Sequence, residues 1–207
     1  MNDRVGSTFT QLARGVFEHL GQQDRYAHSV RVARCADVLA QRHRSDSRKA
    51  RIAGLLHDLA RLYSPARLLF ECEARNLRID DFERSHPVLL HARLGAAIAR
   101  EKFGVDDGEV LSAIEKHTTA AGQMSTLDCI VYLADSLEPA RTFPERAAVW
   151  ELALRDLRAA MREVLLLIFR RHARKGVAAA PPTLAAARIF GANPSYVVIP
   201  EVKASAS

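Results

Sequence analysis

Six side chains of the kinds that bind transition metals lie in the first two thirds of this 207-residue chain. All are histidines or aspartates, whose imidazole nitrogens and carboxylate oxygens suit borderline ions such as iron, manganese and zinc. Two such ions placed close together lower the pKa of a water between them and so supply hydroxide for hydrolysis; a carboxylate can bridge them, whereas an imidazole cannot. The six residues are His28, His57, Asp58, His91, His117 and Asp135.

Taken singly, each of these residues also has an ordinary explanation. The adjacent pair His57-Asp58 can be a surface pair or a helix cap, His28 can face solvent, and Asp135 can be exposed near the end of a helix. An acidic residue with neighbours as apolar as those of Asp135 is nevertheless costly to bury unless it is paired or bound to a metal. Adjacent residues on a helix point about 100° apart, so His57 and Asp58 can share a centre only if other helices complete it. The hypothesis therefore requires several helices that meet at one point.

The sequence predicts such helices. Apolar residues recur at the helical period from end to end, and only the short stretch 196–199 is rich in β-branched residues. The expected fold class is therefore all-α. We expect a charged, loop-like stretch over residues 73–84, and helices over residues 8–19, 24–41, 47–62, 65–72, 85–103, 108–117, 126–137, 145–172 and 183–190.

Composition and length fit an ordinary globular protein. The chain is 48% hydrophobic and 26% charged, and we expect residues 1–207 to form a single domain with a frayed tail over residues 191–207. No apolar run approaches the roughly 18 to 20 residues of a membrane helix, and the polar start is no signal peptide, so we expect a cytoplasmic protein without a membrane partner. The three cysteines are far apart and form no C-x-x-C pair, which argues against a disulfide framework and a zinc ribbon.

The positive charge of the chain leaves its partner open. A net charge of +6 and a pI of about 9.6 suit a polyanion such as nucleic acid or a nucleotide polyphosphate. Basic residues gather at 42–44, 48–51 and 170–175, but none of these clusters alternates with aromatic residues as a base-stacking surface would. Solvated helix faces explain most of them, and we do not expect a nucleic-acid partner.

Short motifs around the six residues narrow the hypothesis. They read RYAH at 25–28, LLHD at 55–58, LLHARLGA at 89–96, KHTT at 116–119, MS at 124–125, YLAD at 132–135 and EPARTFP at 138–144. The ordered ligand set resembles the two-metal branch of the HD-domain superfamily of metal-dependent phosphohydrolases. The flanking motifs resemble, more narrowly, the YqeK family of bacterial enzymes, which cleave diadenosine tetraphosphate symmetrically to two ADP. The resemblance covers roughly residues 10 to 190.

The resemblance implies an HD-domain helical bundle with a metal site between its helices. It implies two divalent metal ions, with iron as the usual metal and manganese or zinc as alternatives. A hydroxide that bridges ions about 3.5 to 4 Å apart would attack phosphorus in line, so no serine or cysteine nucleophile is needed. Asp58 would bridge the two ions and act in catalysis. One ion would be held by His28, His57, Asp58 and Asp135, and the second by His91 and His117 together with the bridge.

Further residues are expected to contact the dinucleoside polyphosphate substrate. Arg61 and Arg141 are candidates for catalysis and for holding phosphates, because a guanidinium matches phosphate geometry bidentately. Arg141 can instead be a solvated loop residue. Thr118 and Thr119 can hydrogen-bond phosphate or fix the preceding histidine, and His86 is expected to be a substrate contact.

The chain departs from the family pattern at three places. Arg61 stands where the family usually has lysine, which keeps the charge but puts proton transfer from that position in doubt. Ala92-Arg93 replaces a usual Gly-Pro, and Ala120 replaces a usual glycine after His-Thr-Thr. The last change can reshape the loop over the site.

Two other functions stay open. The metal site alone does not determine which leaving group departs from phosphorus. A nucleotidase or a cyclic-nucleotide phosphodiesterase would use the same chemistry. A non-catalytic nucleotide- or RNA-binding module would fit the basic pI, although it would need a broken ligand set. The sequence leaves the oligomeric state unknown, and a homodimer is one of the options.

Overall fold

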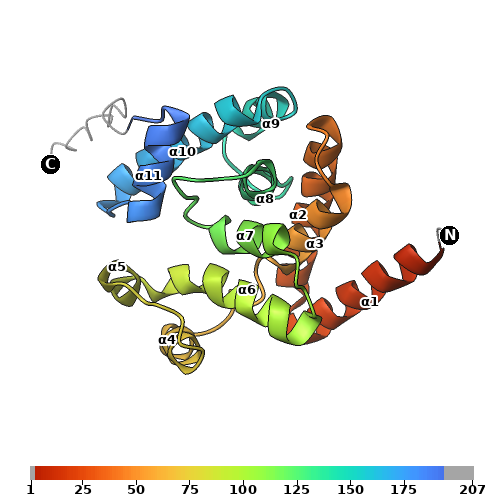
Figure 1. Ribbon diagram of the computed structural model, residues 1–207. Helices are drawn as coiled ribbons and strands as arrows, with labels where there is room; N and C mark the ends of the chain where they lie inside the picture. Colours follow the sequence, from red (N-terminus) through yellow and green to blue (C-terminus); the bar gives the residue numbers. More distant parts are fainter. Residues whose placement is uncertain (1–2, 194–207) are drawn as a thin grey trace, which may run out of the picture.

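The computed structural model describes residues 3–193, which form α-helices and one short 3-10 turn without any strand (Figure 1). This confirms the all-α prediction. The elements are α1 (Asp3–Leu20), α2 (Gln23–Arg42), α3 (Ser47–Leu56), α4 (Pro65–Ala74), α5 (Asp81–Ser85), η1 (Pro87–Leu89), α6 (Leu90–Phe103), α7 (Gly108–Lys116), α8 (Thr126–Leu137), α9 (Arg146–Ala153), α10 (Leu157–Lys175) and α11 (Pro181–Phe190).

Helices α2, α3, α6, α7 and α8 form the centre of the bundle. Helix α2 packs along both α3 and α8, and α7 packs against α6, α3 and α8. Figure 1 shows α4 and α5 beside α6 at one end, and α9, α10 and α11 gathered beside α8 at the other. Helix α8 lies deepest, because every residue from 127 to 134 is buried. The central helices therefore surround the point that the metal hypothesis requires.

Side-chain caps set where two of these helices begin. The Asp107 carboxylate accepts hydrogen bonds from the backbone N–H groups of Glu109 and Val110 at the start of α7. At the start of α8, Ser125 and Asp128 form a reciprocal capping box. Each cap satisfies backbone donors that have no partner within the helix. The caps thereby fix the starts of the helices that lead to His117 and carry Asp135.

Several predicted boundaries were wrong. The expected helix over 85–103 begins only at Leu90, after the separate elements α5 and η1, and the expected helix over 8–19 begins at Asp3. The expected helix over 47–62 ends at Leu56, and residues 57–62 form turns. The expected helix over 145–172 is two helices, because the Asp156 carboxylate caps a new start by accepting from the backbone N–H of Ala159 at 3.0 Å. The expected loop over 73–84 contains the beginning of α5, which a capping box starts at Asp80. The stretch 196–199 lies outside the described residues.

One apolar core fills the space between the helices. Its largest fully buried side chains come from the central helices, and the three cysteines are buried and unbonded to one another. Among residues 3–193, no helix combines the length and the apolar character that crossing a membrane requires.

Gly54 allows α3 to lie directly against α2. A Cβ atom at this position would sit 2.9 Å from the Cα of Ala33 and 3.0 Å from its backbone nitrogen. Real Cβ atoms do not approach backbone that closely, so any side chain would push the two helices apart. Because His28 lies on α2 and His57 directly follows α3, this contact also sets how closely the two histidines approach.

We predict that Gly54→Ala lowers the free energy of unfolding by about 1 to 3 kcal/mol, the usual cost of overpacking a core. Gly108→Ala is the matched control, because nothing lies within 4 Å of a Cβ atom there. The control should stay within about 0.5 kcal/mol of the wild type. Urea unfolding of both variants measures the difference, and equal midpoints for the two would contradict the packing argument.

Candidate metal centre and its cavity

The structure brings all six candidate ligands together in the centre of the bundle. Their side chains form three overlapping groups in which the potential ligand atoms lie within 4.8 Å of one another. Five of the six residues are buried, and the side chain of Asp135 is 19% exposed. The contributing elements are α2 for His28, the turn after α3 for His57 and Asp58, α6 for His91, the end of α7 for His117 and α8 for Asp135.

Asp58 lies between two pairs of histidines. Its Oδ2 atom is 3.3 Å from the Nε2 atom of His57 and 3.6 Å from that of His28. Its Oδ1 atom is 3.4 Å from the Nε2 atom of His91 and 3.7 Å from that of His117. Each oxygen of this one carboxylate therefore serves a different pair, as a bridging ligand must.

Backbone carbonyl groups fix the orientation of three of the imidazoles. The Nδ1 atoms of His57 and His117 donate hydrogen bonds of 2.7 Å to the carbonyl oxygens of Gly54 and Ile114. The Nδ1 atom of His91 donates to the carbonyl oxygen of Val88 in the same way. A carbonyl oxygen only accepts, so the proton of each neutral ring sits on Nδ1. Each Nε2 atom is thereby left with a lone pair that points at Asp58.

A buried carboxylate orients the fourth histidine. The Nδ1 atom of His28 donates to Oε1 of Glu138 at 3.2 Å, and Oε2 of Glu138 accepts from the Nε atom of Arg31 at 2.6 Å. Glu138 is only 2% exposed. A carboxylate behind a metal-binding histidine fixes its ring and raises its basicity. Glu138 begins the motif EPARTFP, and no role was predicted for it from sequence, although its position three residues after Asp135 was the available signal.

The distances within each histidine pair fit a shared cation. The Nε2 atoms of His28 and His57 lie 3.3 Å apart, and those of His91 and His117 lie 3.2 Å apart. Nitrogen ligands at about 2.0 to 2.1 Å from one ion are separated by roughly 3 to 3.4 Å. Two lone pairs that face each other this closely repel unless positive charge lies between them. The Oδ1 atom of Asp135, 3.1 Å from Nε2 of His28, adds an oxygen to the first pair.

The electrostatics of the centre also favour cations. Burial opposes ionisation of Asp58, yet the neighbouring His57 holds the pKa of this carboxyl well below its usual range. Burial lowers the pKa of His117, which keeps its ring neutral and able to act as a ligand. Burial also lowers the pKa of His57, but Asp58 and Asp135 raise it more, so that the net shift is upward. A proton and a metal ion therefore compete for the lone pair of His57.

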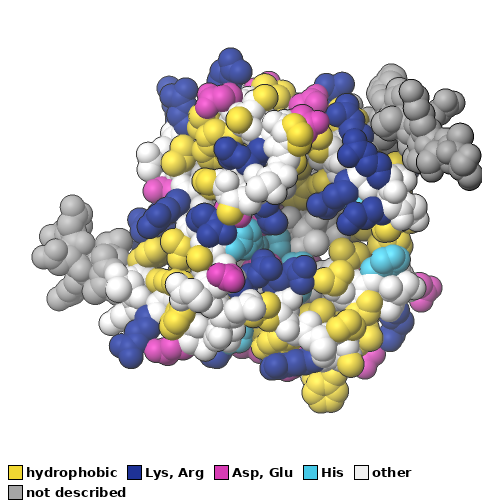
Figure 2. Space-filling model, turned by 180° about the vertical axis from the view of Figure 1, so that it is seen from behind, with side chains coloured by type: hydrophobic (Ala, Val, Ile, Leu, Met, Phe, Trp, Pro, Cys, Tyr) yellow, Lys and Arg dark blue, Asp and Glu magenta, His cyan; other side chains and the backbone are white. Residues whose placement is uncertain are grey.

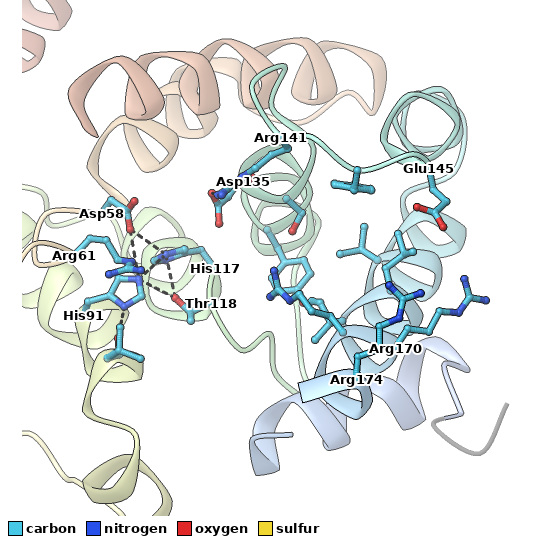
Figure 3. Close-up of a pocket in the computed structure, with 18 of the residues that line it drawn as sticks. Asp58, Arg61, His91, His117, Thr118, Asp135, Arg141, Glu145, Arg170 and Arg174 are labelled. Atoms are coloured by element: carbon cyan, nitrogen blue, oxygen red, sulfur yellow. Dashed lines mark hydrogen bonds and ion pairs between the residues drawn. The ribbon is translucent and has the colours of Figure 1, made fainter. Parts of the chain in front are cut away.

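A cavity of about 640 Å³ opens from this centre toward α10. Figure 2 shows histidine side chains in a hollow that is surrounded by Lys and Arg side chains. In Figure 3, Asp58, His91, His117 and Thr118 lie on one side of the cavity, whereas Arg170 and Arg174 lie on the other. The wall is partly apolar, with Phe143, Val164, Leu167 and Ile168 among its residues.

Three of the five predicted substrate contacts line this cavity, namely Arg61, Thr118 and Arg141. The described structure does not place His86 or Thr119 on the cavity wall. The ring of His86 stacks on Phe82 at 4.3 Å and donates to the Phe82 carbonyl oxygen. The Thr119 hydroxyl donates to the carbonyl oxygen of Ala120 at 3.2 Å.

The arginines around the centre differ in how they are paired. Arg141 donates from Nη2 to Oδ1 of Asp135 at 2.5 Å, so part of its charge is already used inside the site. Arg25, which the sequence analysis did not single out, donates to Oδ2 of Asp58 at 2.7 Å. Within residues 9–193, whose side chains the structure describes, no ion pair involves Arg61. Its guanidinium, which Figure 3 shows beside Asp58 and His91, is therefore free to bind phosphate.

The loop after His117 is strained at the position where the family usually has glycine. Ala120 has a φ of +56°, in the left-handed region that costs an L-residue roughly 1 to 2 kcal/mol. The backbone shape typical of glycine is therefore kept despite the substitution. The carbonyl oxygen of Thr119 in the same loop accepts a 2.8 Å hydrogen bond from the hydroxyl of Thr183 on α11. The last helix thus holds the loop that presents Thr118, whose hydroxyl lies 3.1 Å from Nε2 of His91.

Comparisons with known proteins agree with this geometry. The sequence pattern of the HD domain matches residues 25–140. The symmetrical bis(5'-nucleosyl)-tetraphosphatase of Bacillus subtilis is 37% identical over 139 residues, which cover 67% of this chain and 74% of that protein. The protein of the same name from Halalkalibacterium halodurans is 34% identical over 163 residues, or 79% of this chain and 87% of that one.

A solved structure is similar along most of the chain. It is the crystal structure of a predicted HD superfamily hydrolase involved in NAD metabolism from Clostridium acetobutylicum. It is 32% identical in sequence and superposes with a TM-score of 0.84, covering 88% of this chain and 96% of that one. The two helical bundles therefore share one fold.

We predict that Asp58→Ala loses both ions together, because each of its oxygens serves one histidine pair. His117→Ala should empty mainly the site that it shares with His91. Metal analysis of the purified proteins gives the number of ions per chain. Retention of two ions by Asp58→Ala would rule out a bridging role.

We predict that Glu138→Gln lowers the affinity for the ion bound through His28 by roughly ten- to a hundredfold, because the amide no longer raises the basicity of that histidine. The second ion should bind as before. Glu145→Gln is the matched control, since Glu145 lines the cavity but has no ion pair within the described residues. Competition with a metal chelator measures both affinities. An unchanged first affinity would show that Glu138 only supports the fold.

Proposed function

Because the chain belongs to the HD-domain family of metal-dependent hydrolases, we propose that it cleaves dinucleoside polyphosphates. The specific reaction is the cleavage of diadenosine tetraphosphate in the middle of its phosphate chain to two ADP. The names of the Bacillus and Halalkalibacterium relatives support this choice of substrate. The cofactors proposed are two divalent ions, iron first, with manganese or zinc as alternatives.

The position of Asp58 carries the proposal. One carboxylate faces two histidine pairs, at one end of a cavity whose other lining residues include several arginines. When bound there, divalent ions would lower the pKa of coordinated water and neutralise phosphate oxygens. The donor set of four imidazoles and two carboxylates suits such ions.

The protein's own residues would orient the phosphate chain. Arg61 has no competing carboxylate and can bind phosphate oxygens bidentately. Arg141 already holds Asp135, so its guanidinium would contribute through the donors that this pair leaves free. The Thr118 hydroxyl, close to the His91-His117 pair, can donate to a phosphate oxygen. Symmetric cleavage requires these groups to place a phosphorus beside the central bridging oxygen at the metal centre.

Other functions fit less well. A nucleotidase or a cyclic-nucleotide phosphodiesterase could use the same centre, but a mononucleotide would leave the far part of the cavity, along α10, without a role. A non-catalytic nucleotide- or RNA-binding module would not need all six ligand positions, and all six converge.

We predict that the metal-loaded protein converts diadenosine tetraphosphate to two ADP. In oxygen-18 water, one of the two ADP molecules should carry the label, because water attacks a single phosphorus. Chromatography with mass detection identifies the products. AMP with ATP would mean asymmetric cleavage and contradict the proposal, and activity on mononucleotides or cyclic nucleotides alone would move the protein to another reaction of the family.

A further inference from the structure

Three arginines of α10 line the cavity at the end opposite the metal centre. They are Arg170, Arg171 and Arg174, and Figure 3 shows two of them across the cavity from His91 and His117. From sequence alone they belonged to a basic cluster that a solvated helix face would explain. The structure leaves all three exposed and also places them on the wall of the same cavity as the candidate ligands.

These three arginines have no carboxylate partner among residues 9–193, although ion pairs hold many other arginines in this part of the protein. Arg25, Arg31 and Arg141, for example, each contact a carboxylate within 2.7 Å. Glu145 is the carboxylate that lines the far end of the cavity, and it lies beyond ion-pair distance of all three. No carboxylate of the described residues therefore forms an ion pair with these three guanidinium groups.

Their placement on one turn of helix makes this charge unfavourable for the fold. Residues 170 and 174 are four positions apart and lie on the same face, where like charges repel. The helix dipole favours positive charge in the last turn of α10, which accounts for Arg174 and Lys175. It does not account for Arg170 or Arg171, nor for the fact that all three line a cavity while Lys175 does not. An anion bound in the cavity would relieve the repulsion.

The cavity between the two charged ends limits what this anion can be. Its volume of about 640 Å³ is in the range of small-molecule sites, and it is continuous from Asp58 to Arg174. Phosphate oxygens suit guanidinium donors, and the apolar residues of the cavity wall suit a base or ribose that lies beside the phosphate chain. A ligand that reaches both ends must carry negative charge along its length.

We propose that Arg170, Arg171 and Arg174 form a second phosphate site, which holds the phosphates of the substrate that lie farthest from the metal centre. This proposal rests on the proposed function and extends it, because it makes α10 the element that selects polyphosphate chains over mononucleotides. A ligand with a single phosphate reaches only one of the two charged ends. The selectivity would thus lie in a helix outside residues 25–140, where the HD domain matches.

The test compares two triple variants in the metal-loaded protein. The first replaces Arg170, Arg171 and Arg174 by glutamine, which keeps the aliphatic stem of each side chain and removes its charge. The matched control makes the same change at Arg34, Arg48 and Arg100, which are exposed, lie off the cavity and have no ion pair within the described chain. Both variants lose three positive charges, so long-range electrostatics is balanced between them.

The probe is diadenosine tetraphosphate with a methylene group in place of its central bridging oxygen, which cannot be cleaved there. Calorimetry should show its dissociation constant raised roughly ten- to a hundredfold or more in the α10 variant, and by less than about threefold in the control. With the cleavable substrate, the loss should fall mainly on KM. Replacement of the three arginines by lysine should restore binding only in part, because lysine keeps the charge without the bidentate geometry.

Melting temperatures without ligand separate a binding role from a structural one. Removal of mutually repelling charges offsets the loss of the dipole interaction of Arg174, so the melting temperature of the α10 variant should not fall below that of the control variant. A lower melting temperature, or equal probe affinity in the α10 variant and the wild type, would overturn the proposal. If the wild type does not cleave diadenosine tetraphosphate but its probe binding still depends on the three arginines, the proposed reaction fails and the second phosphate site stands.

Discussion

The hydrogen bonds on the outer nitrogens of four histidines determine what the interior of this protein can hold. Each bond places a proton on Nδ1 and so turns an Nε2 lone pair toward the carboxylate of Asp58. Lone pairs and ionised carboxylates that meet in a buried space repel one another unless cations join them. The fold therefore commits its centre to positive charge before any substrate is considered. Metal binding and stability are linked in such an arrangement, because the ions join helices that are distant in the sequence.

The ends of helices and turns supply most of this geometry. His57 and His117 each follow the last residue of a helix and donate to a carbonyl oxygen three residues earlier, at Gly54 and Ile114. His91 repeats the same spacing with Val88 in η1. Carbonyl groups at the end of a helix lack partners within the helix, so an imidazole N–H satisfies them at no cost to the backbone. One local device thus orients three rings that come from three different parts of the chain.

How much of the fold and of the site the sequence could predict depends on how far apart in the chain the interacting residues lie. Helical period and capping residues are local, and they predicted the all-α class and the helices α2, α4, α7 and α8 with small errors at their ends, but they missed α5 and extended α3 by six residues. The break between α9 and α10 was missed because the apolar period continues across Asp156, whose capping role is visible only in the structure. The six candidate ligands were found from their types and their order. The roles of Glu138, Arg25 and the arginines of α10 depend on which helices face one another, which no local pattern contains.

The residues that line the two ends of the cavity come from different parts of the chain, and their order has a consequence for biosynthesis. All six candidate ligands lie between residues 28 and 135, whereas Arg170, Arg171 and Arg174 come later, as does Thr183, which holds the loop of Thr118. A chain that emerges from the ribosome folds from its amino-terminal side first. The helices that surround the metals can therefore assemble while α10 and α11 are still being made. A nascent chain could therefore bind metal ions before α10 has been made, so that metal loading would precede completion of the far wall of the cavity.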